Sequence, residues 1–352
     1  MKKLLCLFVL AAAGMTAFAQ SDVVNFIRSG KEDASKLFKA YLEPYAYAFG
    51  DGLGNGWYNS AGTHRLLGVD LSLNVSAVKI PSGSKTFNIN DLGLTRTVLI
   101  SPNGEAPTVA GAEEDGPELA VYLDPQDPST EILRFNTPQG TGWDLVPVPM
   151  VQVGLGVLPN TDIVVRYVPK LSFNDDEIEI GLFGVGAKYN FIRAIPYLRH
   201  LPFDAAFFLN YSNIDASSDL TFTSADYNLG AGVPVNDTYV QDDNQELSIK
   251  THAWNYGLIV SKKISVLTIF ASVGRSSAKT DADLKGSYPF IQEGDNTFVI
   301  YGEKDPIALD FDKANMAVNA GLRIKLAFFS IFGSVNHAEY TSYNAGLSFG
   351  VR

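Results

Sequence analysis

The chain has 352 residues, a net charge of −11 at pH 7 and only 18% charged residues. This acidic balance excludes nucleic acid as a partner, because phosphate binding needs a basic surface. The only cysteine is Cys6, so neither a disulfide framework nor a thiolate metal site is expected.

Residues 1–19 have the layout of a secretory signal peptide. Lys2 and Lys3 give a basic start, residues 4–13 are apolar, and residues 17–19 offer a small-x-small cleavage site. The apolar run is too short for a membrane-spanning helix, which needs about 20 residues. We therefore expect cleavage and export. The alternative is an uncleaved N-terminal helix.

A helix is expected at the start of residues 20–65. Ser21 can cap it, Gly30 would separate two helical pieces, and Pro44 would end it. One apolar face recurs at helical spacing in Ala34, Leu37, Phe38, Tyr41 and Leu42.

A glycine-rich and aromatic segment follows this helix. Glycines recur over residues 50–56, where we expect sharp turns, and Trp57, Tyr58 and Asn59 come next. We expect residues 20–65 to form a plug. Trp57, Tyr58 and Asn59 are candidates for seating this plug or for lining a ligand path.

From residue 66 the hydrophobic pattern changes to a period of two. In residues 67–77 apolar side chains alternate with Gly, Asp, Ser and Asn, over the 9–11 residues that a barrel strand needs to cross a bilayer. The same alternation recurs along the chain. The further segments are 151–157, 163–167, 182–189, 203–212, 254–260, 267–273, 314–325, 329–340 and 343–351.

We expect residues 66–352 to form an all-β, antiparallel transmembrane β-barrel of 12–14 strands. The ten recognised segments need an even number of further strands from residues 79–148, which have room for two or four. If that region is only a loop, the count is ten. The alternative fold is a large soluble β-sandwich or barrel with a dry core.

The two faces of these strands differ in chemistry. Polar side chains on one face suit a wet lumen, and apolar and aromatic side chains on the other suit lipid. The candidate lumen-facing residues are Asp70, Asn74, Arg166, Asn210, Asn319 and Arg323.

The lengths of the connections between strands indicate which end of the barrel is periplasmic and which is extracellular. Known barrels have short periplasmic turns and longer extracellular loops. We expect the N-terminal helix to stay at the periplasmic end. The expected inner connections are 158–162, 191–202, 261–264 and 326–328, and the expected outer ones are 170–177, 213–246, 277–313 and 340–342.

The sequence contains no pattern typical of a catalytic, cofactor or metal site. His64, His200, His252 and His337 are far apart and form no His-x-x-x-His pair, so no metal is expected. Ser248 and His252 would lie about 13 Å apart along a strand, too far for direct proton transfer. We expect neither enzymatic activity nor a cofactor.

The C-terminal pattern Asn344-x-Gly346-x-x-Phe349-x-Val351 resembles the signal that barrel-assembly machinery reads. That signal often ends on an aromatic residue, and here Arg352 follows. The resemblance implies the cell outer membrane as the location. Barrel-assembly machinery and outer-membrane lipid are the partners it implies.

Two stretches resemble an uncharacterised family of secreted outer-membrane proteins. The first stretch combines residues 33–44 with residues 56–61, and the second is residues 159–169. The layout is also distantly similar to the FadL-type fatty-acid transporters, which are 14-stranded barrels with an N-terminal hatch in the lumen. Their hatch often carries Asn-Pro-Ala before the first strand, and Asn59-Ser60-Ala61 keeps its two ends.

This resemblance implies an outer-membrane channel or transporter for passive uptake of a small hydrophobic molecule. Residues 21–62 would occlude the lumen, and movement near residues 52–59 would release the ligand. One alternative is a non-conducting structural or surface-interaction barrel that uses its large acidic loops. A third hypothesis, an outer-membrane hydrolase, has little support in the sequence.

Overall fold

The computed structural model describes residues 24–122, 126–127, 131–173, 178–227, 229, 235–242, 244–294 and 297–351. The expected signal peptide, residues 1–19, lies outside these ranges.

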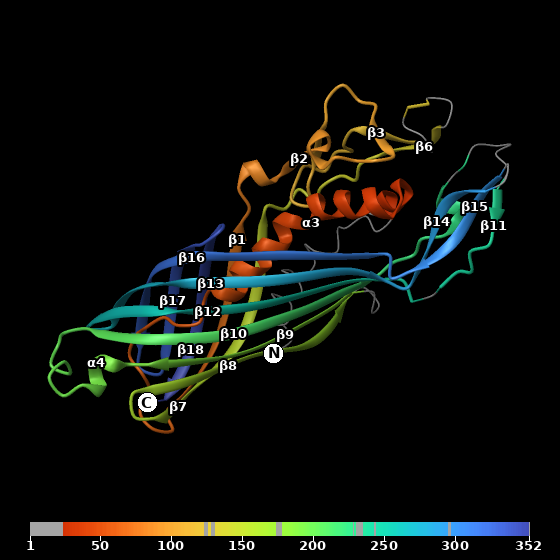
Figure 1. Cartoon of the computed structure of the whole chain (residues 1–352). Coiled ribbons are helices and arrows are strands. Elements are labelled where there is room, and N and C mark those ends of the chain that lie inside the picture. The colour runs from red at the N-terminus through yellow and green to blue at the C-terminus, as the bar shows by residue number, and fades with distance from the viewer. Residues whose placement is uncertain are drawn as a thin grey trace.

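Ten strands close into one antiparallel barrel (Figure 1). The ring closes at β1, where Val69 lies opposite Val351 of β18 on one side and Leu155 of β7 on the other. The barrel strands are β1 (Val69–Lys79), β7 (Leu145–Leu158), β8 (Thr161–Phe173), β9 (Ile178–Tyr189), β10 (Asp204–Asp219), β12 (Glu246–Ile264), β13 (Leu267–Lys285), β16 (Ile307–Leu326), β17 (Phe329–His337) and β18 (Thr341–Val351).

The expectation of 12–14 barrel strands is therefore wrong, because the connection between β1 and β7 adds none. It folds into two small sheets above the barrel (Figure 1). Their strands have three to six residues, too few to cross a bilayer. They are β2 (Thr86–Asn88), β3 (Thr97–Leu99), β4 (Glu105–Pro107), β5 (Glu118–Tyr122) and β6 (Glu131–Asn136), with the 3-10 turns η2 (Ser82–Ser84) and η3 (Ile89–Leu92).

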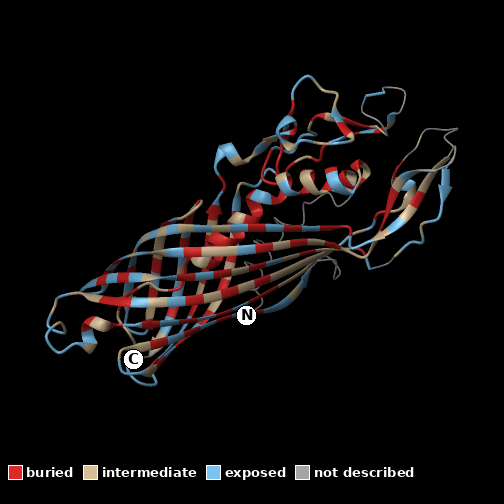
Figure 2. Cartoon of the chain, in the orientation of Figure 1, coloured by how far each residue is buried: buried red, intermediate tan, exposed pale blue. Residues whose placement is uncertain are grey.

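The outer surface of the barrel is an apolar belt. Buried and exposed residues alternate along the strands (Figure 2), and the exposed set is apolar. Examples are Leu71, Val153, Phe183, Leu209, Trp254 and Val318. A closed ring leaves no strand edge unpaired in lipid, and a belt of this kind is unfavourable in water. The protein is a transmembrane antiparallel β-barrel of the outer-membrane type.

Four neighbouring strands are longer than a membrane crossing requires. β10, β12, β13 and β16 have 16, 19, 19 and 20 residues. They extend into the stretches 213–246 and 277–313, which we expected to be loops. Beyond the apolar belt β13 exposes polar side chains such as Lys279, so this part of the wall is suited to water.

The helix α3 (Lys31–Gly54) follows the 3-10 turn η1 (Val24–Ser29). The expectation that Pro44 ends the helix is wrong, because Pro44 lies inside it and is buried. The helix also continues through the glycine run, where we expected turns. A Cβ at Gly52 would lie 2.5 Å from Val148 Cγ2, so small residues let the helix approach the wall here.

The helix begins at the end of the barrel that carries the long connections. Lys31 Nζ lies 2.7 Å from Glu303 Oε1 of β15 (Thr297–Lys304). Asp33 accepts hydrogen bonds from the backbone N–H groups of Thr95, Arg96 and Thr97. The expectation that the helix stays at the end with the short turns is therefore wrong.

The main apolar core lies at this same end, between α3, η1 and the long connections. Phe26 packs edge-on against Phe38 and Tyr41. The connection from β10 to β12 contains η5 (Ser224–Tyr227) and β11 (Val235–Asp237), and the connection from β13 to β16 contains β14 (Ser287–Gly294) and β15. Strands β11, β14 and β15 form one sheet. At the opposite end the connections include the short helix α4 (Phe191–Ala194) (Figure 1).

None of the helices in the described part of the chain is long and apolar enough to span a membrane.

Candidate functional site

The second half of α3 and the residues that join it to β1 pass down the inside of the barrel. We call residues 46–64 the lumenal segment. Its upper end is marked by a hydrogen bond from Thr280 Oγ1 of β13 to the Ala46 carbonyl (3.3 Å). Its lower end is marked by His64, whose backbone N–H donates to Asp162 Oδ1 (2.8 Å) of β8. The lumenal segment therefore occupies the length of the lumen.

Arg166 of β8 holds the C-terminal end of α3. Its guanidinium donates to the carbonyls of Leu53 (2.9 Å) and Asn55 (2.7 Å). These carbonyls lie at the negative end of the helix dipole, where a cation is favourable. The guanidinium also lies 3.7 Å over the Trp57 ring and donates to Gln152 Oε1 (3.0 Å). Arg166 is 0% exposed, so its charge is fully enclosed by the lumenal segment and the wall.

A belt of asparagine side chains surrounds the turn that follows α3. We call Asn74, Asn210, Asn255, Asn319, Asn336 and Asn344 the amide belt. Asn74 and Asn255 donate to the carbonyls of Gly56 (3.0 Å) and Gly54 (2.7 Å). Asn319 donates to Asn55 Oδ1 (3.1 Å). Two pairs lie directly opposite each other in the ladder, Asn210 with Asn255 and Asn319 with Asn336.

A cluster of charged side chains holds the lower part of the lumenal segment. Lys188 of β9 donates to the carbonyls of Ser60 (3.0 Å) and Gly62 (2.8 Å), and lies 3.3 Å from Asp162 Oδ2. His64 Nδ1 is 3.1 Å from the same carboxylate, and His64 Nε2 is 3.5 Å from Asp70 Oδ1. Paired ionisable side chains therefore hold the chain where it leads into β1.

The three candidates on the lumenal segment all contact the barrel wall. Trp57 packs against Arg166, as described above. Tyr58 Oη donates to Asn210 Oδ1 (2.8 Å), and Asn59 Oδ1 accepts from Arg323 Nη1 (2.9 Å).

The six candidates on the strands also meet this segment. Asn74, Arg166 and Asn319 contact the turn after α3. Asn210 contacts Tyr58, Arg323 contacts Asn59, and Asp70 lies beside His64. The sequence reasoning missed Asp162, Lys188, Asn255 and Gln152. The signal was available, because Lys188 and Gln152 occupy the polar face of segments already recognised as strands.

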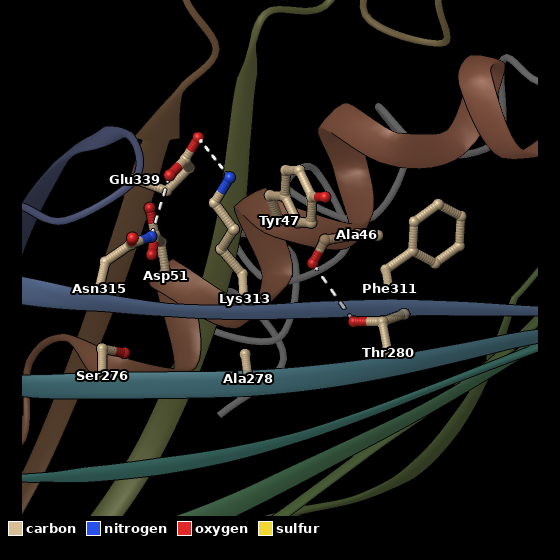
Figure 3. Close-up of a pocket in the computed structure, with 10 residues that line it drawn as sticks. All are labelled: Ala46, Tyr47, Asp51, Ser276, Ala278, Thr280, Phe311, Lys313, Asn315 and Glu339. Atoms are coloured by element: carbon tan, nitrogen blue, oxygen red, sulfur yellow. Dashed lines mark hydrogen bonds and ion pairs between the residues drawn. The ribbon is translucent and has the colours of Figure 1, made fainter.

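At the upper rim α3 crosses β13 and β16 (Figure 3). Lys313 of β16 lies 3.2 Å from Glu339 Oε1, which follows β17. Asp51 Oδ2 accepts a hydrogen bond from the Tyr340 backbone N–H (2.6 Å). Burial raises the pKa of Asp51 to about 7, and the nearby Glu339 adds to this rise. Asp51 is therefore the group at this contact that titrates near neutral pH.

Two narrow cavities of about 30 Å³ each lie between the lumenal segment and the wall, and a smaller one of about 10 Å³ lies beside Asp51 at the upper rim (Figure 3). The two larger cavities have room for a few water molecules. Of these, the upper cavity lies beside Trp57, Tyr58 and part of the amide belt, and no Asp, Glu, Lys, Arg or His lines it. The lower cavity is lined by the charged cluster and Arg323.

No group of three His, Cys, Asp or Glu side chains that could hold a metal ion occurs among the described residues.

The fold and the lumenal segment define a transmembrane β-barrel whose own N-terminal region fills its lumen. Residues 1–351 match the family described as "Family of unknown function (DUF6588)", and the chain belongs to this family. No curated protein matches the sequence.

Several solved membrane barrels are similar to the chain at low scores. The attachment invasion locus protein Ail of Yersinia pestis is 7% identical, with a TM-score of 0.28 over 82% of this chain and 100% of that chain. The translocator domain of the autotransporter NalP of Neisseria meningitidis is 8% identical, with a TM-score of 0.30 over 91% and 98%. The TodX monoaromatic hydrocarbon channel is 9% identical, with a TM-score of 0.26 over 88% and 75%. At such scores the likeness assigns no function.

Proposed function

We propose that this protein is a gated channel of the outer membrane that its own N-terminal region closes. The gate opens when residues 54–64 leave the barrel wall. The observation that supports this proposal is the polar character of the contact between the segment and the wall. Water can replace hydrogen bonds to carbonyls and amides at small net cost. A plug that never moved would be more stable with apolar packing, because water cannot replace apolar contacts.

The conformation of the gate also favours movement. Residues 55–64 contain neither helix nor strand, so they have no backbone ladder of their own to break. Their contacts come from side chains such as Arg166, Lys188 and Asn74. Segments held in this way belong to the low-stability parts of a protein.

The wall that this movement would uncover is largely polar, apart from an apolar patch of Ala206, Phe208, Ile259 and Phe270 that packs against Ala61 and Tyr58. The resemblance implied a small hydrophobic molecule as the solute, and Trp57 and Tyr58 could meet such a molecule. Behind them, however, lie the amide belt, Arg166 and Lys188. A hydrophobic solute would gain only from the apolar patch and would leave the polar groups of the rest of the wall without partners. We therefore infer that a small polar molecule is the better solute.

A non-conducting barrel is the second candidate function. Arg166 and Lys188 each donate to two carbonyls of the lumenal segment, and contacts of this density could keep the lumen closed permanently. The long connections would then carry the function by binding a surface partner. Conductance separates the two functions.

The test uses cysteines at positions 54 and 276 in the full chain. A Cβ at Gly54 would lie 3.0 Å from Ser276 Oγ of β13 and closer still to Asn255 Nδ2. Once the end of the Asn255 side chain turns aside, the two thiols are placed to form a disulfide. Reduced protein in planar bilayers should open and close, and oxidised protein should stay closed. Gly54→Cys alone should not respond to oxidant. Equal conductance in both redox states, or no openings in either state, would contradict the gated channel.

We also propose that the lipid of the outer membrane and the barrel-assembly machinery are its partners, and that it is not an enzyme. The pair considered for a hydrolase has other partners. Ser248 Oγ accepts from Lys285 Nζ (3.2 Å), and His252 Nδ1 bonds Tyr211 Oη (2.9 Å). Purified protein incubated with phospholipid should release no fatty acid.

A further inference from the structure

The upper cavity has a lining of unusual composition. Four asparagines of the amide belt, Asn210, Asn255, Asn319 and Asn336, line it together with Ser272. Trp57, Tyr58 and Phe208 provide aromatic faces, and the Tyr58 and Phe208 ring centroids are 5.9 Å apart. Amide and aromatic groups therefore meet in one place.

Two of these asparagines keep unused hydrogen-bonding atoms. Asn210 is 2% exposed, and its Oδ1 accepts from Tyr58. Its Nδ2 has no partner among the described residues. Asn319 Nδ2 donates to Asn55, while its Oδ1 has no partner within the described ranges. Buried amides in native proteins normally have all such atoms paired. The cavity lining thus includes one asparagine with an unpaired donor and one with an unpaired acceptor, both buried in the closed state.

We propose that this cavity is part of a binding site for a small uncharged sugar. A hydroxyl group both donates and accepts, so it satisfies the free donor of Asn210 and the free acceptor of Asn319. The aromatic faces suit the apolar C–H face of a sugar ring. A charged ligand is disfavoured, because no Asp, Glu, Lys, Arg or His lines the cavity. The lower cavity, with its charged cluster, presents the opposite chemistry.

This inference rests on the proposed channel, since the present cavity of about 30 Å³ is too small for a whole hexose. The sugar enters as Tyr58 withdraws from Asn210, while Trp57 stays over Arg166 and covers its charge. The amides that now hold the lumenal segment then hold the solute. The asparagine amides thus exchange hydrogen bonds to the lumenal segment for hydrogen bonds to the sugar when the closed state converts to the sugar-bound state.

Trp57 fluorescence in the full chain tests binding. Trp143→Phe and Trp254→Phe leave Trp57 as the only tryptophan, since the chain has three. Glucose should change the emission saturably, whereas gluconate and cyclohexanol should not. Asn210→Leu with Asn319→Leu should weaken glucose binding at least about tenfold, because each lost amide contact contributes about 1 kcal/mol. Asn213→Leu, on the outward face of the same strand, should bind glucose as before.

No response to glucose, or an unchanged response in the double variant, would overturn the sugar site. The double variant must first show the heat-shifted gel migration of a folded barrel. If it fails to fold, Asn210→Asp alone replaces it, and this added charge should abolish the glucose response.

Liposome swelling with the unmutated chain separates this inference from the channel. Faster swelling in glucose than in gluconate, lost on Asn210→Asp, supports both. Swelling that follows solute size alone retains the channel and removes the sugar site. A saturable glucose response without swelling retains the site and removes the channel.

Discussion

At the scale of residues, Arg166 and Lys188 are buried cations that donate hydrogen bonds to backbone carbonyls of the lumenal segment, and Lys188 is also paired with Asp162. Arg166 donates to Leu53 and Asn55, and Lys188 donates to Ser60 and Gly62. A charge buried without such partners costs several kcal/mol. The two side chains therefore stabilise the closed barrel only while the lumenal segment is in place.

We expect Arg166→Met to lower the free energy of unfolding by about 3 kcal/mol, because three hydrogen bonds to a charged group disappear. It should also raise the open probability of the channel. Urea unfolding in detergent micelles and bilayer recording measure the two effects. Arg275→Met, on the exposed face of β13, should change stability by less than about 0.5 kcal/mol. Equal effects of both substitutions would contradict this role of Arg166.

Asp51 should make the docking of α3 depend on pH. Burial raises its pKa to about 7 from an ordinary value of 3.8, so the docked state favours the protonated carboxyl. This stabilisation is complete below pH 3.8 and is lost as the pH rises toward 7. Above pH 7 the docked helix carries a buried charge.

Asp51→Asn should remove this dependence. The melting temperature of the unmutated chain should fall between pH 5 and pH 8 by more than that of the variant. An identical fall in both proteins would show that Asp51 does not titrate in this range.

At the scale of elements, the alternating pattern predicted the transmembrane barrel but not the number of its strands. Alternation is local, and each strand carries it independently. The number of strands in residues 79–148 was wrongly predicted. The short strands that pair in two small sheets outside the barrel have a sequence pattern similar to that of barrel strands. The end of α3 was misjudged because Pro44 is buried in tertiary contacts, which override local preference.

The candidate site was predictable only in part for a similar reason. Alternation indicates the face of a strand on which a side chain lies, but not what it meets there. Arg166 contacts Leu53 across 113 residues of sequence. The spare atoms of Asn210 and Asn319 likewise depend on the positions of Tyr58 and Asn55.

The turn at Gly56 should be sensitive to any side chain. Its φ is +72°, and a Cβ would lie 2.6 Å from Asn344 Nδ2 of the amide belt. We expect Gly56→Ala to cost about 2 kcal/mol of unfolding free energy, from backbone strain and the displaced asparagine. Gly93 has φ +59° with nothing within 4 Å, so Gly93→Ala should cost only about 1 kcal/mol. Equal costs would mean that the amide belt does not crowd this turn.

At the scale of the whole molecule, the two ends of the barrel differ in the length of the connections that lie there. The long connections and the start of α3 share one end, and α4 and the short turns lie at the other (Figure 1). Because outer-membrane barrels carry their long loops outside, we infer that α3 enters the lumen from the extracellular side.

Single cysteines should report this orientation. Val240 is 80% exposed near the long connections, and Tyr197 is 92% exposed beside α4. A membrane-impermeant thiol reagent added to intact cells should label Val240→Cys and not Tyr197→Cys. Both should react once the cells are lysed. Labelling of Tyr197→Cys alone in intact cells would reverse the orientation.

The central claim is that the N-terminal region lies inside a membrane-spanning barrel and closes it. Thiol labelling of Gly54→Cys with Ser276→Cys in isolated outer membranes tests this most directly. We expect both thiols to resist labelling after the oxidised membranes are dissolved in denaturant, and to react once a reductant is added. In the same denaturant both thiols of Gly54→Cys with the outward-facing Ser277→Cys should react without reductant. Free thiols in the first pair, or recovery of the protein in the soluble fraction, would contradict the claim.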